Sequence, residues 1–222
     1  MTQPARLPPG TDDGMAARVR AHDWSSTPVG PAHGWPQSLQ TALSICLSSR
    51  FPMHVWWGPE LTVFYNDAYV PAMGDKHPDA LGGRAARVWA EAWSELGPMA
   101  ESVLAGEGAT FSEDQLLFLR RHGYLEETYW TFSYSPVQDE SGGIGGIFVA
   151  VSDTTTRVVG ERRLRVLGDL GELSTVSVGT AEEASRAVVG VLARHRAEVP
   201  FVAAYLRSPE GNLRLVAAHG VT

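Results

Sequence analysis

Five β-strand patterns, in a fixed order along the chain, constrain the fold of this sequence more than any other feature. Two short patterns, at residues 53–57 and 61–66, are separated by a Gly-Pro-Glu turn and predict a hairpin. Three longer patterns follow at residues 110–121, 124–137 and 145–152, and these are rich in β-branched and aromatic residues. Strands joined by short turns pair antiparallel, so we expect a two-stranded hairpin followed by a group of three antiparallel strands.

Helical patterns precede the strands and fill the gap between their two groups. Apolar residues recur at helical spacing over residues 37–49, and Asn66 is a good cap for a short helix over residues 68–73. A longer pattern over residues 84–104 contains Pro98, which we expect to break it into two pieces. The sequence therefore predicts a sheet with flanking helices.

A change in composition near residue 155 divides the chain. Residues 1–155 carry nine Arg or Lys against 18 Asp or Glu and hold all seven Trp, whereas residues 156–222 carry nine against seven. We expect residues 1–22 to be disordered, because the first of them are rich in Pro, Gly, Thr and Asp without periodicity. Residues 23–155 then form the main domain, whose irregular N-terminal arm packs on it as a cap and buries Trp24 and Trp35.

The last third of the chain has two further predicted parts. Residues 156–174 form an amphipathic helix in which Leu164, Leu167 and Leu170 recur amid Arg and Glu, as in a two-stranded coiled coil. Residues 175–222 predict one helix and one hairpin, which cannot close a core by themselves, and we interpret them as the truncated start of another domain.

Composition excludes several classes of function. The formal net charge of −7 argues against binding of nucleic acid, and no apolar run approaches the roughly 18 to 20 residues that span a bilayer. The single Cys excludes an internal disulfide and favours a reducing, cytoplasmic location. No catalytic or metal-binding motif is recognisable, so we expect neither an enzyme nor a metal site in these residues.

The order of strands and helices over residues 37–155 resembles a PAS domain. This resemblance implies an α+β fold in which all five strands form one antiparallel sheet with flanking helices. Several stretches are similar to the N-terminal PAS module of bacterial multidomain sensor histidine kinases, namely Asp23-Trp-Ser-Ser-Thr-Pro-Val-Gly-Pro, Gly34-Trp-Pro-Gln-Ser-Leu, Phe51-Pro-Met-His-Val-Trp-Trp-Gly-Pro and Phe64-Tyr-Asn-Asp-Ala-Tyr. In these sensors a GAF domain follows the PAS domain, and residues 175–222 look like the opening of one. The resemblance implies a non-catalytic sensory domain that regulates a downstream kinase.

The resemblance also implies a cavity between the sheet and the helices, of the mostly apolar kind that binds small ligands. Core packing is the alternative role for each aromatic candidate, and helix capping is the alternative for Asn66. Flavin-binding PAS domains need a Cys after the second strand and haem-binding ones usually a His on the long helix, and this chain has neither. We therefore expect no cofactor or an unidentified small ligand. The candidate residues of the cavity are Trp56, Tyr65, Asn66, Trp93, Tyr129, Phe132 and Tyr134.

We expect none of the seven histidines to form a functional site. His195 lies in a segment similar to the phosphoacceptor of histidine kinases, but Pro200 ends that helix, so we discount it. The other six are expected at the surface or in the core with their hydrogen bonds satisfied, and these are His22, His33, His54, His77, His122 and His219.

A signal would leave the PAS domain at its last strand. Asp153, Thr155 and Arg157 resemble the junction that joins this strand to an output helix, which we expect to form a parallel homodimer together with the PAS cap. The simpler alternative is that the helix packs on the PAS sheet. A second function remains open as well, that of a ligand-free PAS module that dimerises a sensor or a phosphatase regulator.

Overall fold

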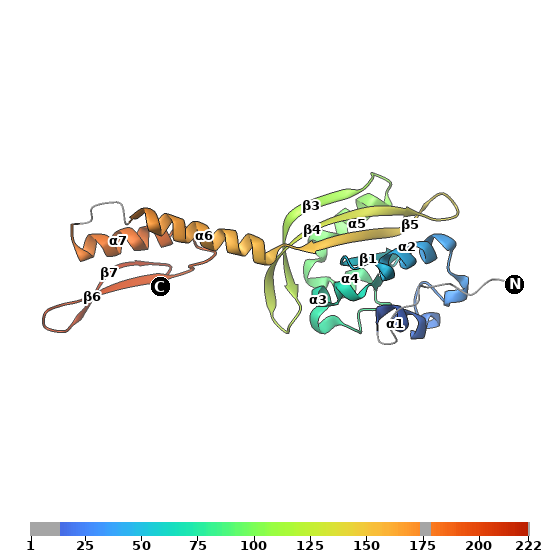
Figure 1. Ribbon diagram of the computed structural model, residues 1–222, viewed down its shortest axis with the longest axis horizontal. Helices are drawn as coiled ribbons and strands as arrows, with labels where there is room; N and C mark the ends of the chain where they lie inside the picture. Colours follow the sequence, from blue (N-terminus) through green and yellow to red (C-terminus); the bar gives the residue numbers. More distant parts are fainter. Residues whose placement is uncertain (1–13, 174–178, 222) are drawn as a thin grey trace. The chain divides into compact units, whose positions relative to one another are not determined.

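A computed structural model describes residues 14–173 and 179–221 (Figure 1). The chain divides into two compact units, with the boundary between Thr155 and Thr156.

The first unit is built on a five-stranded antiparallel sheet (Figure 1). Its strands follow the order β2-β1-β5-β4-β3, so β1 lies between its hairpin partner β2 and the last strand β5. The structure confirms the predicted α+β fold. The strands are β1 Met53–Trp57, β2 Thr62–Tyr65, β3 Thr110–Arg120, β4 Leu125–Gln138 and β5 Ile144–Asp153.

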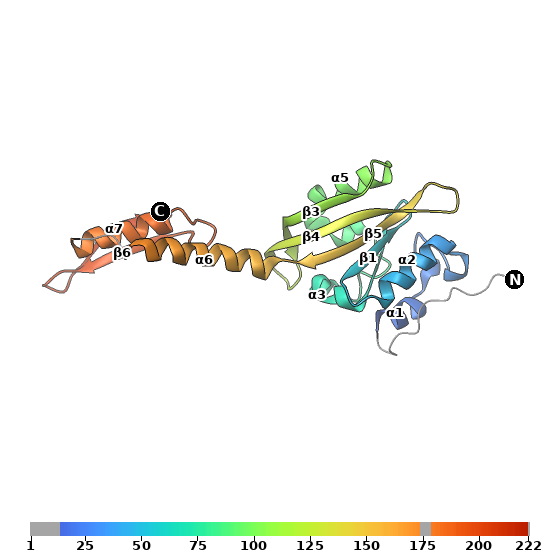
Figure 2. The same ribbon diagram turned by 45° about the horizontal axis from the view of Figure 1, so that its top comes forward.

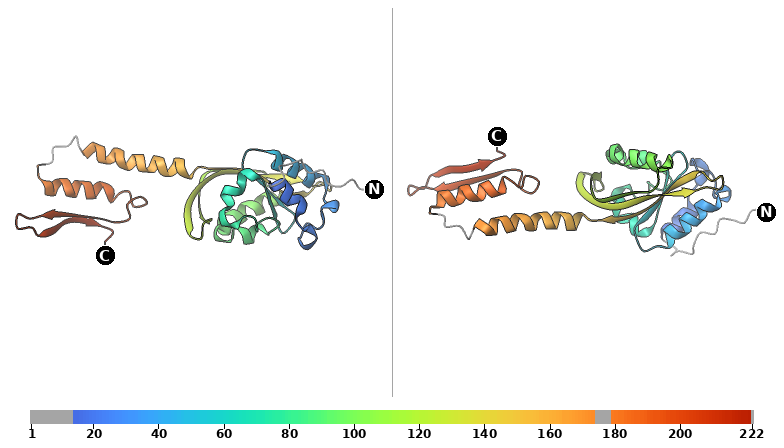
Figure 3. Two further views of the ribbon diagram at one scale, coloured as in Figure 1. Left: turned by 60° about the horizontal axis from the view of Figure 1, so that its bottom comes forward. Right: turned by 90° about the horizontal axis from the view of Figure 1, so that it is seen from above.

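Helices cover both faces of this sheet. The long helix α5, Trp93–Leu104, contacts β4 and β5 on one face, and α2, Gln37–Ser48, contacts β1 on the other (Figures 2 and 3). The remaining helices are short, namely α1 Met15–Ala21, α3 Val70–Met73 and α4 Ala85–Val88, with 3-10 turns at Trp24–Ser26, Ala32–Gly34, Asp67–Tyr69, Gly74–Lys76 and Ala90–Ala92.

The N-terminal arm packs on the domain as predicted. The Trp24 ring stacks on Phe64 with 4.7 Å between ring centroids, and the edge of Trp35 meets the same ring at 5.5 Å. The indole N–H of Trp24 donates to the carbonyl of Val19 at 2.7 Å. Two buried tryptophans thus fix an arm that has little regular structure of its own.

The predicted disorder of residues 1–22 is wrong for its last part, because Met15–Ala21 forms helix α1. Met15, Ala16 and Val19 are buried in the core, and the backbone N–H of Met15 donates to Asp67 Oδ1 at 2.8 Å. These contacts with distant residues stabilise a helix that is too short to form alone. The first 13 residues of the predicted segment lie outside the described residues.

The predicted break at Pro98 is also wrong. Pro98 lies inside α5, and the helical pattern is interrupted earlier, where Trp89 and Ala92 have non-helical backbone angles. Both residues are buried in the core. Packing of these side chains decides where the helix begins, and α5 accommodates the hydrogen bond that Pro98 removes.

The second unit contains two helices and a hairpin, as the sequence predicts for residues 156–222. They are α6 Thr155–Leu173, α7 Ala181–Leu192, β6 Val202–Arg207 and β7 Leu213–His219, with the two strands antiparallel. Thr180 caps α7, since its hydroxyl accepts the backbone N–H of Glu183 at 3.1 Å. No helix among the described residues is both long and apolar enough to cross a membrane.

The leucines of α6 do not share one face. Leu164 and Leu167 are 67% and 64% exposed, whereas Leu170 is half-buried and Val166 is buried. A helix turns about 100° per residue, so residues three apart drift steadily around it. Of the leucines predicted to form the dimer contact of α6, which we call the leucine seam, only Leu164 and Leu167 are exposed. Val166 and Leu170 lie on the packed side of the helix.

Candidate functional site

A small cavity lies inside the first unit, between the sheet and the helices. Its volume is about 30 Å³, which is space for about two water molecules. The wall is almost entirely aromatic and aliphatic. With His54 neutral, none of the residues that form it carries a charge at neutral pH. The lining residues are His54, Trp56, Tyr69, Trp89, Leu96, Leu117, Leu119, Trp130, Phe132, Tyr134, Val149 and Val151.

The alternation of side chains along the strands builds this wall. His54 and Trp56 are two apart on β1 and therefore point to the same face of the sheet. On β4 the same period places Trp130, Phe132 and Tyr134 on that face, and all three are buried. Further lining residues come from β3, β5, α5 and the segment between β2 and α5.

His54 is the most unusual group in the cavity. Its side chain is 4% exposed, and neither ring nitrogen has a hydrogen-bond partner. Burial lowers the pKa of this histidine to about 3, so the ring is neutral at physiological pH. The prediction that His54 is either exposed or satisfied is wrong, because the aromatic rings around it exclude water without replacing its hydrogen bonds.

Three more residues of the cavity wall carry a polar atom, and these are Trp56, Tyr69 and Tyr134. The indole N–H of Trp56 is buried and has no partner, and the Trp56 ring stacks on His54 with 5.1 Å between centroids. Burial raises the pKa of Tyr69 and of Tyr134, and each phenol therefore keeps its proton. The cavity thus combines an apolar wall with a few uncharged hydrogen-bonding groups, which is typical of small-molecule sites.

The structure distributes the predicted cavity residues between several places. Trp56, Phe132 and Tyr134 line the cavity. Tyr65 lies elsewhere in the core, and its hydroxyl is 2.9 Å from Nδ1 of His77. Trp93 packs beside the cavity, its ring centroid 5.9 Å from that of Trp56. Tyr129 is half-buried and belongs to the opposite face of β4.

Asn66 is a structural residue and does not line the cavity. It is fully buried, and its Oδ1 caps the next helical turn by accepting the backbone N–H of Tyr69 at 3.1 Å, which confirms the capping alternative. Every other polar contact of its side chain is also with backbone. Oδ1 accepts from Met53 N at 3.1 Å, and Nδ2 donates to the carbonyls of Cys46, Ser49 and Phe51 at 3.1, 3.1 and 2.7 Å.

Sequence reasoning missed most of the cavity wall, His54 and Trp130 above all. The period-two pattern from Thr128 to Tyr134 placed Trp130 on the same face as Phe132, so that signal was available. His54 likewise alternates with Trp56. The short turns that carry Tyr69 and Trp89 gave no comparable signal, because their orientation depends on tertiary packing.

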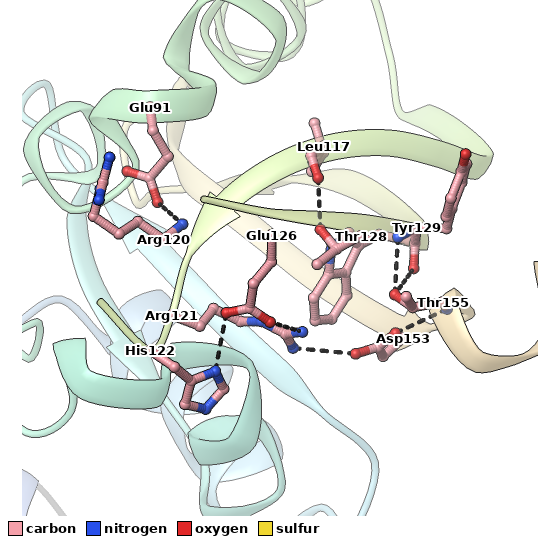
Figure 4. Close-up of polar contacts among 11 residues, drawn as sticks. Glu91, Leu117, Arg120, Arg121, His122, Glu126, Thr128, Tyr129, Asp153 and Thr155 are labelled. Atoms are coloured by element: carbon pink, nitrogen blue, oxygen red, sulfur yellow. Dashed lines mark hydrogen bonds and ion pairs between the residues drawn. The ribbon is translucent and has the colours of Figure 1, made fainter. Parts of the chain in front are cut away.

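The predicted junction residues Asp153 and Thr155 hold the start of α6 to the sheet (Figure 4). Asp153 Oδ1 accepts the backbone N–H of Thr155 at 2.9 Å. The Thr155 hydroxyl oxygen accepts the backbone N–H of Tyr129 at 2.9 Å. The first residue of the helix is therefore fixed to β4 and to the end of β5. Arg157, the third junction residue, pairs with Glu161 one turn further along α6, at 3.0 Å.

Arg121 connects this junction to the β3–β4 hairpin (Figure 4). Its side chain is 13% exposed and binds Asp153 at 3.2 Å and Glu126 at 2.9 Å. Burial acts to raise the pKa of Glu126, but hydrogen bonds from His122 and Arg121 outweigh burial and lower it. The carboxylate is thus charged at neutral pH, and Arg121 lies between two anions.

Trp130 links Arg121 to the cavity. The guanidinium carbon lies 5.6 Å from the centroid of the Trp130 ring, within the range of a cation–π interaction. The indole N–H donates to the Thr128 hydroxyl at 2.8 Å, and that hydroxyl donates to the carbonyl of Leu117 at 2.7 Å. The ring that lines the cavity is therefore also a contact of the junction.

A sheet of this order with a cavity between its inner face and the helices defines a PAS-type domain. Residues 48–159 match the PAS fold family, which is half of the chain, and the protein belongs to this family. No curated protein matches the sequence. The family match ends at residue 159, so the GAF resemblance of residues 175–222 stays a prediction.

Solved structures of PAS and sensor proteins are similar to this chain at low sequence identity. A sensory box sensor histidine kinase from Vibrio cholerae is 19% identical with a TM-score of 0.35, and the match covers 53% of this chain and 87% of that one. The PAS domain of BvgS from Bordetella pertussis is 20% identical with a TM-score of 0.36, and the match covers 59% and 97%. A PAS domain from Colwellia psychrerythraea is 14% identical with a TM-score of 0.41, covering 53% and 98%.

Among the described residues, no cluster of three or more His, Cys, Asp or Glu side chains is arranged to hold a metal ion.

Proposed function

We propose that this PAS domain is the sensory region of a bacterial signal-transduction protein, that the cavity is its sensing site, and that the junction at Asp153 carries the state of the cavity to helix α6. One observation supports this coupling above all. The Trp130 ring lines the cavity and contacts the guanidinium of Arg121, and the same guanidinium binds Asp153, which caps Thr155.

The physical basis of the coupling is a competition for one guanidinium. A cavity occupant that turns the Trp130 ring removes a cation–π contact worth roughly 0.5 to 2 kcal/mol and changes the balance between Asp153 and Glu126. A partly buried charge needs partners, so Arg121 stays paired with carboxylates whether or not it keeps the Trp130 contact. The arrangement with the Trp130 contact and the arrangement without it are the two states, and a cavity occupant shifts their populations.

The output in this proposal is a downstream kinase domain of a cytoplasmic two-component sensor, as the resemblance to the N-terminal modules of such sensors implies. The PAS domain itself regulates and does not catalyse. In this proposal α6 pairs with its copy in a parallel homodimer, so that a change at Thr155 alters the pairing of two helices.

Hydrogen exchange in the whole chain tests the coupling. Arg121→Gln removes the charge but keeps much of the side-chain volume, and we expect faster exchange of the backbone N–H groups at the start of α6 and in β4 beside Tyr129. Arg120→Gln is the matched control, since that side chain is exposed and donates to the Gly123 carbonyl at 3.2 Å. Equal exchange in both variants and the natural protein would refute the coupling.

A ligand-free dimerisation module is the second candidate function. It is supported by the exposed pair Leu164 and Leu167 on α6, which lies among exposed polar and charged side chains of that helix. In that case dimer formation persists when the cavity is filled by substitution, for example by Val149→Phe, and the exchange of α6 does not respond to the cavity.

A further inference from the structure

The hairpin that carries Arg121 places a histidine beside the junction. His122 lies in the turn between β3 and β4, and its Nδ1 is 2.9 Å from Glu126 Oε1 (Figure 4). We propose that His122 makes the junction sensitive to pH, because its protonation strengthens the hold of Arg121 on Asp153 and thereby the cap of α6. This inference rests on the proposed role of the junction and specifies a signal that regulates it.

Two carboxylates share one guanidinium in this cluster. Glu126 Oε2 accepts from Nη2 of Arg121 at 2.9 Å, and Asp153 Oδ2 accepts from Nη1 at 3.2 Å. One cation between two anions leaves a negative charge in excess as long as His122 is neutral. Protonation of His122 places a positive charge within hydrogen-bond distance of Glu126 and removes that excess.

The different exposure of these groups lets the histidine report on the solution. The side chains of Arg121 and Glu126 are 13% and 12% exposed, whereas that of His122 is 54% exposed. Solvent and salt screen partly buried charges much less than exposed ones. The His122 ring can therefore exchange its proton with water while its charge acts on groups that water scarcely reaches.

Protonation of His122 changes the pairing of Arg121 in one direction. Both side chains bind Glu126, one at each carboxylate oxygen, so a positive imidazole shares the charge of Glu126 and repels the guanidinium. Both effects weaken the pair with Glu126 and favour the pair with Asp153. Because Asp153 Oδ1 accepts the backbone N–H of Thr155 at 2.9 Å, a more firmly held Asp153 caps α6 more persistently.

Other charged groups approach this hairpin from a neighbouring 3-10 turn. Asp75 in that turn donates its backbone N–H to the carbonyl of Arg121 at 2.7 Å, and its own side chain is exposed. The adjacent Lys76 is paired with Glu91. Between about pH 5 and 8, histidine is the side chain that ordinarily changes its charge. His122 is thus the group through which a change of pH in this range acts on the cluster.

Hydrogen exchange of the full chain as a function of pH tests the proposal. NMR follows the backbone N–H of Thr155 between about pH 5.5 and 8, and division by the intrinsic rate at each pH gives its protection. We expect protection to rise about two- to fivefold toward the acidic end, the effect of one partly exposed ion pair. His122→Gln should abolish this rise, and His33→Gln, at another exposed histidine, should retain it.

Arg121→Gln tests whether the guanidinium carries the effect. Without that charge His122 has no cation to direct toward Asp153, and we expect the protection of Thr155 to become independent of pH over this range. A flat profile in the natural chain would overturn the proposal, and so would a rise that persists in either His122→Gln or Arg121→Gln. The comparison of Arg121→Gln with Arg120→Gln at a single pH tests the proposed coupling, so the two ideas can fail separately.

Discussion

Trp130 on β4 and Asp153 on β5 are directly paired across the sheet. This pair places a residue of the cavity wall beside the residue that caps helix α6. Between the two side chains lies the guanidinium of Arg121, which contacts both. A change in the cavity therefore has a path of direct contacts to the first residue of the helix.

The pH dependence of stability should reveal His54. Its pKa is about 3 in the folded chain against about 6.5 when unfolded, so the unfolded state binds the extra proton. The contribution of His54 to the free energy of unfolding is complete above pH 6.5. It is lost as the pH falls from there toward 3, at up to about 1.4 kcal/mol per pH unit. Urea unfolding of the first unit at several pH values measures this slope.

We expect His54→Phe to reduce the slope in that window, because the titrating group is gone while the aromatic packing remains. The phenol groups of Tyr69 and Tyr134, which face the same cavity, stay protonated throughout this range. His33→Phe should leave the slope as it is in the natural chain. A slope that is unchanged by His54→Phe would show that the ring is not held neutral.

Asn66→Ala should destabilise the first unit by about 3 kcal/mol or more. The substitution leaves the backbone N–H groups of Met53 and Tyr69 and three carbonyls without their buried partner. Asn212→Ala, on an exposed loop of the second unit, should change stability by less than about 0.5 kcal/mol. Chemical denaturation followed by tryptophan fluorescence reads the first unit, and a loss under 1 kcal/mol would contradict the prediction.

Gly146 should not tolerate a side chain. A Cβ atom there would lie 2.5 Å from the carbonyl oxygen of Trp56 and 2.6 Å from the Trp57 ring, so the β1–β5 pairing would have to shift. We expect Gly146→Ala to cost about 2 kcal/mol, the usual range for overpacking. At Gly34 the same test finds no atom within 4 Å, and Gly34→Ala should be neutral. Equal melting temperatures of the two variants would count against this packing.

Leu167→Glu should convert a dimer into a monomer if α6 forms the proposed seam. Leu167 is 64% exposed and lies beside Leu164, so a charge there disrupts pairing without disturbing the packed side of the helix. Arg165→Gln, at another exposed position of α6, is the control and should remain dimeric. Light scattering measures the mass, and an unchanged dimer of Leu167→Glu would eliminate the seam.

Local patterns predicted the elements of this fold well, because a strand or a helix follows from the spacing of a few neighbouring residues. All five strands of the sheet occur where turns and runs rich in β-branched and aromatic residues indicated, and Asn66 caps its helix. Patterns failed where distant contacts decide the outcome. Helix α1 exists because its apolar residues are buried in the core, and α5 begins at Trp93 because Trp89 and Ala92 are held by packing.

The candidate site shows the same limit. The sequence identified aromatic residues near the cavity but placed Tyr65, Asn66 and Tyr129 in its wall, since composition does not say which face of a strand meets the helices. It also treated His54 as an ordinary histidine. Whether a buried polar atom finds a partner depends on side chains from β1, β4 and the turns between β2 and α5, which are far apart in the chain.

The sequence by itself determined the succession of strands and helices and the change in composition near residue 155, because both follow from the local spacing of residue types and from charge. The tertiary structure alone decided that β1 lies beside β5, that the two ring nitrogens of His54 are buried without partners, and that Arg121 joins Trp130 to Asp153. Burial and pairing are properties of contacts between distant residues, and only the folded chain brings those residues together.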